Sequence, residues 1–335
     1  MDRVAAGSEE LFRAQDFGDA PLIYEMLEVL PAPTGRPEVA HTLRMSSIDL
    51  HQGAQAFPAI HKQNATQPPL TLVKVEFDQK VVSRFHTTAD DFINLSRAFH
   101  IHPYALYLIS MDVVSFQQIQ QSSTRATDED HTCRPTYFVN YEALKIVWSY
   151  HPETKSSAGI ILPRASQTGE AAYSQFCTKL RAFCSEDMMT QHPLFPLFIA
   201  ISAATEFFDQ RVVSQERSIS KTEERLPFSP WSLDTPLNIM DARDVQKITW
   251  YSRKMAAAVF EAEDVLRHIN MVTKMRDAFE QVDALVPGHQ SIMDCLDLML
   301  AHLSYSKSYA AFLRERAKNL LGVVNELPEM ETCKC

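Results

Sequence analysis

The sequence has very little glycine: 8 of its 335 residues, where soluble proteins usually contain about 7%. No two of the eight are closer than ten positions. A dinucleotide-binding fingerprint, a phosphate-binding P-loop and the nucleophile elbow of α/β hydrolases each need two or more glycines within about six residues. None of these sites can form here. Few glycines also mean few positive-φ turns, which favours long helices.

Basic residues and long apolar runs are also few. The 32 Lys and Arg are outnumbered by 42 Asp and Glu, which gives a net charge of −10. Because nucleic-acid binding relies on Lys and Arg that neutralise phosphates, we expect no nucleic-acid partner. The N-terminus has no basic, apolar leader, and the longest apolar stretch, residues 193–204, is about half of the ~20 that span a bilayer. We therefore expect a cytoplasmic protein.

The six cysteines predict free thiols rather than a disulfide framework, because no secretory leader precedes them. Cys177 and Cys184 lie seven positions apart in a segment of helical periodicity, so they share one helix face. A free cysteine packs as a small hydrophobe. We therefore expect this pair to belong to a hydrophobic core.

Residues 67–168 alternate between apolar and polar positions in a way that is typical of strands. Val73, Val75 and Phe77, for example, fall on one side of their segment. The alternation predicts five strands, over residues 71–77, 81–86, 137–141, 144–150 and 158–162. Two helices are predicted between them, one from 89 to about 102 and one from 104 to about 121.

From residue 169 onward the apolar spacing is helical throughout. Steps of three and four residues predict helices over 171–183, 194–219, 241–282 and 292–324. The last of these carries a heptad seam from Ile292 to Val324, which is the spacing of a coiled coil. Pro287-Gly288 supplies the reversal before it. The segments predict a long antiparallel helical stalk.

The chain as a whole is therefore predicted to be α+β, with a mixed sheet in an N-terminal domain and a helical stalk behind it. Residues 1–66 are polar and interrupted by prolines, so we expect them to be poorly structured or loosely packed, with short elements only over residues 21–30. The predicted boundaries are 67–168 for the α/β domain, 169–325 for the stalk and 326–335 for a C-terminal tail.

The segment Phe92–Leu106, with the sequence FINLSRAFHIHPYAL, resembles the helix–Leu-His-Pro–helix element of CorA-type magnesium transporters. It is most similar to the divergent CorA-like proteins of filamentous fungi. The order of strand, helix pair, hairpin and long helices agrees with that family over residues 70–325. The resemblance implies a funnel-type α/β/α cytosolic domain followed by stalk helices.

The family's pore is missing from this sequence. CorA-type transporters continue their last stalk helix into a membrane span, and a Gly-Met-Asn signature closes the pore before a second span. This chain instead reads Leu321-Gly322-Val323-Val324-Asn325, and no Gly-Met-Asn occurs in it. We therefore expect that the chain alone does not conduct Mg²⁺. None of the family's cation-sensing acids aligns residue by residue, so no metal ligand is carried over.

One acidic loop is a candidate cation site. Asp128, Glu129 and Asp130, followed by His131, could hold a hard cation such as Mg²⁺ through carboxylate oxygens. The alternative is a solvated surface loop, because no glycine shapes this segment. Mg²⁺ is the one cofactor that the sequence suggests.

The C-terminal Cys333-Lys334-Cys335 resembles the doubly prenylated tail of Rab-type GTPases. Lipid on Cys333 and Cys335 would anchor the chain to a membrane, since two lipid chains give stable binding. The preceding Pro328–Glu331 is acidic rather than polybasic, and the GTPase body is missing. An unmodified tail is the alternative, and we expect membrane contact only if the tail is lipidated.

Three other polar groups have structural explanations. His100 and His102, before Pro103, are expected to end a helix. Asp90 and Asp91, after Thr87-Thr88, are expected to begin one. The third group consists of Glu261, Glu263, Asp264 and His268. It completes no zinc-binding pattern, so it predicts a salt-linked helix face. The spacing identifies no catalytic residue.

We predict a non-enzymatic regulatory or scaffolding protein that contacts protein partners, or a second copy of itself, through its long helices. Without membrane spans to gather subunits, we expect a monomer or a weak oligomer. One alternative is a truncated or incomplete CorA-like divalent-cation transporter. Another is an accessory protein or enzyme whose site forms only in the fold.

Overall fold

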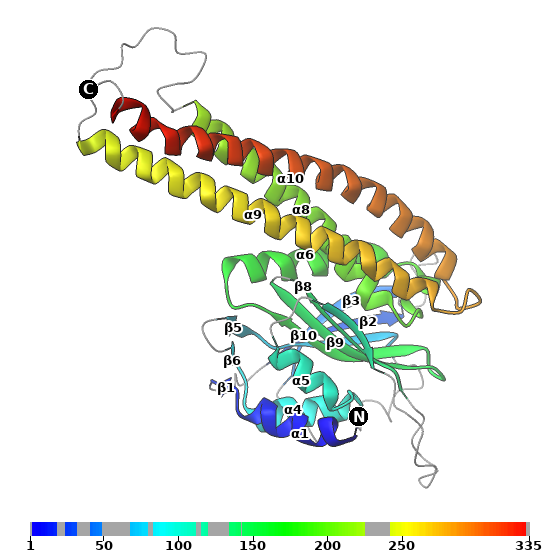
Figure 1. Ribbon diagram of the computed structural model, residues 1–335. Helices are drawn as coiled ribbons and strands as arrows, with labels where there is room; N and C mark the ends of the chain where they lie inside the picture. The colour runs from blue at the N-terminus through cyan, green and yellow to red at the C-terminus, as the bar shows by residue number, and fades with distance from the viewer. Residues whose placement is uncertain are drawn as a thin grey trace. The chain divides into compact units, whose positions relative to one another are not determined.

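The computed structural model describes residues 2–18, 24–31, 41–48, 68–79, 83–111, 115–119, 134–141, 143–224 and 242–332. The chain forms two compact units, which we treat separately. Unit 1 comprises Met1–Ala204 and Met275–Leu296, and unit 2 comprises Thr205–Lys274 and Asp297–Cys335. The three longest helices therefore each contribute to both units (Figure 1).

Unit 1 is built on a mixed sheet of seven strands. Their order in space is β3-β2-β4-β10-β9-β8-β7. Their bounds are Tyr24–Pro31 (β2), His41–Ile48 (β3), Leu70–Lys74 (β4), Ser115–Ile119 (β7), Thr136–Tyr141 (β8), Leu144–His151 (β9) and Ser156–Pro163 (β10). Only the β4–β10 pair is parallel, while the other pairs of this sheet are antiparallel. The predicted α+β class with a mixed sheet is confirmed.

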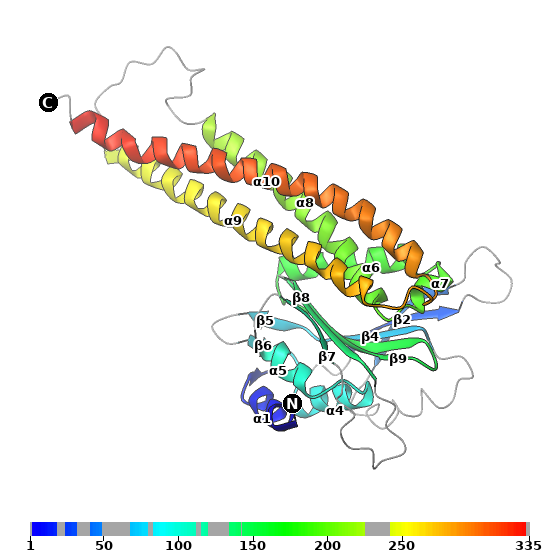
Figure 2. The same ribbon diagram turned by 45° about the vertical axis from the view of Figure 1, so that its right-hand side comes forward.

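Helices cover both faces of this sheet (Figures 1 and 2). One face packs against α1 (Asp2–Arg13), α4 (Ala89–Ala98) and α5 (Tyr104–Ser110), in a core that includes Phe92, Phe138 and Val147. The other face packs against α6, Gln167–Phe183. On that side the indole of the fully buried Trp148 donates a hydrogen bond to the Pro193 carbonyl, 3.0 Å away.

A second, three-stranded sheet corrects one predicted strand. The segment 71–77 is not continuous, because β4 ends at Lys74 and the next strand, β5 (Phe77–Gln79), pairs elsewhere. β5 joins β6 (Ser83–Phe85) and β1 (Asp16–Phe17) in the order β1-β6-β5. Aromatic packing gathers these strands, since the rings of Phe12, Phe17 and Phe85 lie within 5.5 Å of one another, centroid to centroid.

The described parts of residues 1–66 form regular elements, and β2 lies where a short element was expected. α1 buries Phe12 completely, and β2 lies inside the large sheet, between β3 and β4. The neighbouring residues Met26 and Leu27 of β2 point to opposite faces of the sheet, and both are buried. A strand buried on both sides loses the alternation by which a sequence pattern recognises it.

The second helix of the resembling segment was predicted too long. α5 ends at Ser110 rather than near residue 121, and Ser115–Ile119 is the edge strand β7. The sequence between them contains Val113 and Val114, and β-branched residues favour strands over helices. The prediction was too long because the apolar residues of β7 continue the helical spacing of α5.

The predicted long helices are confirmed. They are α8 (Phe195–Glu223), α9 (Ala242–Glu280) and α10 (His289–Thr332), with the short α7 (Asp187–Thr190) before them. The seam of α10 is buried at most of its predicted positions, namely Ile292, Leu296, Leu303, Ser306, Ala310, Leu313, Ala317 and Val324. Within the described part of the chain, no helix combines the length and apolarity needed to cross a membrane.

Candidate functional site

The two sites that the sequence nominated lie outside the described residues. Asp128, Glu129 and Asp130 belong to one such segment, and Cys333 and Cys335 belong to another. The metal site and the lipidated tail therefore stay predictions. Among the residues that are described, no three His, Cys, Asp or Glu side chains form a group that could hold a metal ion.

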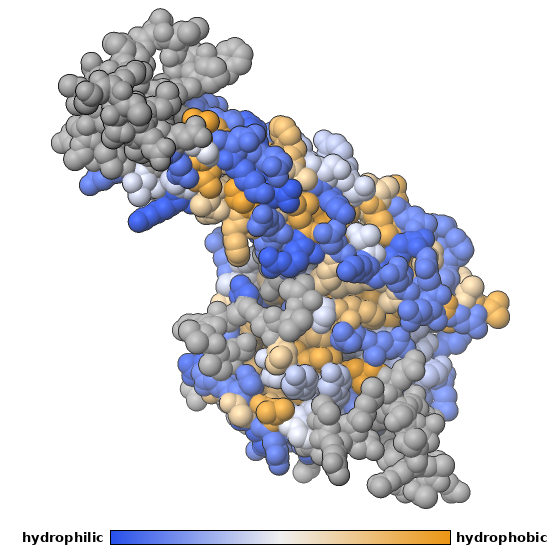
Figure 3. Space-filling view, viewed as in Figure 1, coloured by the Kyte–Doolittle hydropathy of each residue, from blue (hydrophilic) through white to orange (hydrophobic). Residues whose placement is uncertain are grey.

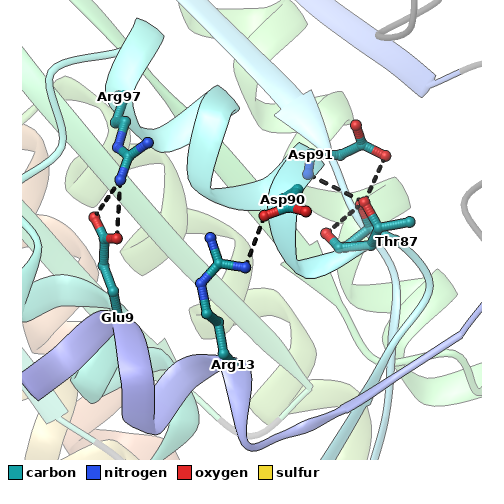
Figure 4. Close-up of polar contacts among 7 residues, drawn as sticks. Glu9, Arg13, Thr87, Asp90, Asp91 and Arg97 are labelled. Atoms are coloured by element: carbon teal, nitrogen blue, oxygen red, sulfur yellow. Dashed lines mark hydrogen bonds and ion pairs between the residues drawn. The ribbon is translucent and has the colours of Figure 1, made fainter.

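Asp90 and Asp91 act at the start of a helix, as predicted. Thr88 is the N-cap of α4: its hydroxyl accepts a hydrogen bond from the Asp91 amide and donates one to the Asp91 carboxylate, at 3.1 and 2.8 Å. Asp90 pairs with Arg13 of α1 at 2.7 Å. A second pair, Arg97 with Glu9 at 2.9 Å, joins the same two helices (Figure 4). These acids fasten α1 to α4 and are not arranged as metal ligands.

His100 and His102 serve the turn between α4 and α5, again as predicted. α4 ends at Ala98, before the predicted end near residue 102, and His100 lies two residues beyond it with a φ of 54°. The His102 ring accepts a hydrogen bond from the Tyr104 amide at 3.1 Å, while its own amide donates to the Thr136 hydroxyl of β8 at 3.0 Å. The His-Pro element is thus a structural connection between the helix pair and the sheet.

A fully buried lysine anchors the far end of that helix pair. Lys145 of β9 donates to the Ile109 carbonyl in the last turn of α5 at 3.1 Å and lies 4.6 Å above the Phe77 ring. The carbonyl end of a helix carries partial negative charge, which a cation stabilises. No sequence pattern indicates this contact, because it joins residues 36 positions apart.

The acidic group on α9 is a salt-linked face, as predicted. Asp264 pairs with Arg211 of α8 and with Arg267, each at 3.4 Å. The ring of His268 is buried and hydrogen-bonds the Asp264 carbonyl at 2.8 Å. Glu263 pairs with Lys318 of α10 at 3.8 Å. The acids of this group connect the helices of unit 2.

Unit 1 contains a buried histidine pair that the sequence did not reveal. The rings of His192 and His289 approach to 3.3 Å between Nε2 and Nδ1, and the Leu194 amide donates to His192 Nδ1 at 3.1 Å. Burial, followed by the repulsion of His289, lowers the pKa of His192 to about 3. With so low a pKa, the buried His192 ring is neutral at pH 7 and serves as a structural contact rather than a proton carrier.

One group in unit 2 has the residue types of a hydrolase triad but not its spatial arrangement, and it consists of Asp209, His302 and Ser306. The Asp209 carboxylate contacts both other side chains, His302 Nε2 and the Ser306 hydroxyl, each at 2.5 Å. Nucleophile activation requires the imidazole to lie between the acid and the serine. Here the serine donates to the carboxylate instead, so the arrangement ties α8 to α10.

A polar cluster between α6 and the sheet contains a cysteine. The Tyr173 hydroxyl donates to Glu25 at 2.9 Å, and Lys74 lies 4.7 Å above the Tyr173 ring. Burial raises the pKa of the neighbouring Cys177 to about 11. The thiolate is the reactive form, and it is scarce at neutral pH when the pKa is that high. Cys177 and Cys184 are both buried free thiols, as predicted.

The most unusual surface of unit 2 lies on the outer side of α10. Leu298, Tyr305 and Phe312 follow one another at heptad spacing and are 75%, 69% and 56% exposed. Tyr309 completes the row, with its ring 6.3 Å from that of Tyr305 and 6.0 Å from that of Phe312. Figure 3 shows how hydrophobic side chains interrupt the hydrophilic surface of the long helices. We call these four residues the α10 stripe.

Contacts within unit 2 hold the α10 stripe in place. A hydrogen bond to Glu216 of α8 raises the pKa of Tyr309. Arg316, one turn beyond Phe312, bonds Glu223 and approaches Ser220 of the same helix. The stripe is therefore a row of apolar side chains on a backbone that α8 supports.

Comparison with known structures supports the predicted architecture. The chain resembles the full-length CmaX protein with a TM-score of 0.51 and 10% sequence identity, over 95% of this chain and 81% of that one. A second similar structure is the cytoplasmic domain of ZntB from Vibrio parahaemolyticus RIMD 2210633, with a TM-score of 0.45, 10% identity and coverage of 92% and 99%. The chain therefore shares the fold of the CmaX structure.

Comparison of the sequence, in contrast, finds no match. No protein-family model matches the chain, and no curated protein matches it either. At 10% identity a structural likeness establishes the fold and leaves the function to the residues of this chain.

Proposed function

We propose that this chain is a non-enzymatic cytoplasmic scaffolding or regulatory protein that binds another protein chain through the α10 stripe. The observation that carries the proposal is the exposure of Leu298, Tyr305 and Phe312 in one continuous row. Monomeric proteins seldom leave large apolar groups contiguous on the surface unless something binds there. Tyrosine and phenylalanine are also enriched where proteins meet.

The free energy of burial supports the same proposal. Each Å² of apolar surface removed from water contributes about 25 cal/mol. A side chain that remains half exposed or more in the free chain still has much of that contribution available to binding. Because the helix fixes the backbone of the stripe, little additional ordering of the backbone would oppose association.

The polar clusters favour binding over catalysis as well. Asp209 holds both His302 and Ser306, Asp264 holds two arginines, and His192 is neutral against His289. In each case the groups that could perform acid–base chemistry are already bound to one another by hydrogen bonds or ion pairs. Their roles support a rigid scaffold that presents a surface.

A photo-crosslinking experiment tests the proposal. A benzophenone amino acid replaces Phe312 in the full chain, which is then expressed in its native cells and irradiated. The matched control places the same group at Phe260, an aromatic residue on α9 that is 67% exposed and lies outside the stripe. We expect a discrete crosslinked protein from position 312 and much less from position 260.

Either kind of partner, a second copy or a different protein, supports the proposed function. Equal crosslinking from both positions would mean that the stripe has no special role. The absence of any crosslink from position 312 would contradict the proposal directly.

A further inference from the structure

We infer that the turn between α9 and α10 is held in unit 1 by an acid-sensitive contact, and that it detaches locally when His192 takes up a proton. The turn segment comprises residues 275–296, all of which belong to unit 1. It packs against the corner between α7 and α8, residues 191–194. This inference is independent of the α10 stripe.

The corner is fixed to the large sheet. The buried indole of Trp148 donates a hydrogen bond to the Pro193 carbonyl at 3.0 Å, and the Tyr150 hydroxyl donates one to the Gln191 carbonyl at 3.2 Å. Both donors come from β9, which lies between β10 and β8. The corner therefore keeps its place on the sheet when the turn segment detaches.

The turn segment contacts the corner through aromatic rings on its inner side. The His192 ring stacks on Phe279 of α9 and on His289 of α10, with centroids 5.9 and 5.6 Å apart. A Cβ on Gly288 would lie 2.4 Å from a backbone oxygen of α7, so the two backbones are close there. The outer side faces solvent, and Leu285 is 89% exposed. A segment held on one side only can open while the rest stays folded.

The hydrogen bonds of the two histidine rings define where their protons lie. The Leu194 amide donates to Nδ1 of His192 at 3.1 Å, so a neutral His192 ring carries its proton on Nε2. Nε2 therefore donates to Nδ1 of His289, 3.3 Å away. In each ring the nitrogen that would take up a second proton already accepts a hydrogen bond. A further proton on either ring breaks one of these bonds and sets two N–H groups against each other.

No carboxylate compensates for a proton at this contact. Burial and then the His289 ring both oppose a charge on His192. In the described part of the chain, none of the charged groups on the surrounding segments pairs with either ring. These groups are Glu186 before α7, Arg276, Asp277 and Glu280 on α9, Asp283 in the turn and Asp294 on α10. A proton on His192 would be buried without a counter-ion, so detachment of the turn segment is the favourable response.

The direction of the pH dependence follows from the two forms. A solvated histidine has a pKa of about 6.5, whereas that of His192 in the closed contact is about 3. The open form therefore binds a proton that the closed form excludes. The closed contact is favoured above pH 6.5 and loses stability as the pH falls below that value. His192 alone should raise the ratio of open to closed form about 25-fold between pH 7 and pH 5.

Hydrogen exchange followed by mass spectrometry tests the inference on the full chain. Peptides covering residues 286–296 are compared with peptides of β9 at pH 7 and pH 5, after correction for the intrinsic rate of amide exchange. We expect the turn peptides to open at least about 25-fold more often at pH 5 and to exchange faster than β9 there. Unchanged protection of the turn peptides would overturn the inference. Equal opening of the turn and β9 at pH 5 would also overturn it, because that pattern is global unfolding.

Two variants identify the group responsible. In His192→Gln the ratio of opening at pH 5 to opening at pH 7 should be about 25-fold smaller than in the wild type. The matched control is His86→Gln, at a histidine of unit 1 whose side chain is 42% exposed, and it should keep the wild-type ratio. Because the measurement is a ratio between two pH values, a variant that is merely less stable does not reproduce the expected result. A wild-type ratio in His192→Gln would show that the inference is wrong.

Discussion

At the scale of single residues, the buried ring of His192 makes stability depend on pH. Burial holds the pKa of His192 at about 3, below the 6.5 of an unfolded histidine. A folded pKa below the unfolded one means that the contribution is present above pH 6.5. It is lost as the pH falls from 6.5 toward 3, because the unfolded state then binds a proton that the folded state excludes.

We expect His192 to account for about 2 to 3 kcal/mol of stability lost between pH 7 and pH 4.5. The comparison is urea unfolding of the wild type and of His192→Gln at both pH values. The variant cannot take up this proton, so its loss of stability over the same interval should be smaller by that amount. Identical pH dependence in the two proteins would refute the assignment.

Single residues also show what local sequence can predict. The cap formed by Thr88 and Asp91 depends on residues three positions apart, so the sequence contained it. The contact of Lys145 with Ile109 joins two elements, so the sequence did not contain it. Local contacts follow from spacing, whereas contacts between elements require the fold.

At the scale of elements, the reversal between α9 and α10 depends on one glycine. Gly288 has a φ of +75°, in the left-handed region that other residues adopt at a cost. A Cβ at this position would lie 2.4 Å from the Met188 carbonyl oxygen of α7. The position therefore excludes a side chain on two separate grounds.

Gly288→Ala should lower the free energy of unfolding by about 2 to 4 kcal/mol. Gly322→Ala is the matched control, because Gly322 lies in α10 and no atom lies within 4 Å of the point that an alanine methyl group would occupy there. That change should stabilise the chain by up to about 1 kcal/mol through helix propensity. Chemical denaturation measures both effects, and equal effects of the two changes would contradict this role of Gly288.

The elements differ in how well their sequences predicted them. The heptad seam of α10 is long and regular, and the helix it predicted is present. The segment of β2 was expected only as a short element of unspecified type, because burial on both faces removes the alternation of a strand. The early end of α5 was missed, because a neighbouring strand can continue helical spacing. The secondary structure of a long periodic segment can be predicted despite such local ambiguity, whereas that of a short segment cannot.

At the scale of the whole molecule, the suggested Mg²⁺ site remains a prediction with a simple test. A cation that binds only the folded chain raises its stability by mass action. If Asp128 and Asp130 hold Mg²⁺, the wild type should melt at a higher temperature in Mg²⁺ than in chelator. Asp128→Ala or Asp130→Ala should remove that difference. A wild type that melts identically in both conditions would end the hypothesis.

The sequence by itself determined the long helices, the α4 cap, the strands of the β9–β10 hairpin and the α+β class, because each follows from periodicity or from neighbouring residues. The tertiary structure decided which strands pair, as in the insertion of β2 beside β4. The seam of α10 through Leu303 and Ala310 was predicted from its spacing and is buried. A second row, through Tyr305 and Phe312, was not predicted, and the packing of the helices of unit 2 leaves it exposed.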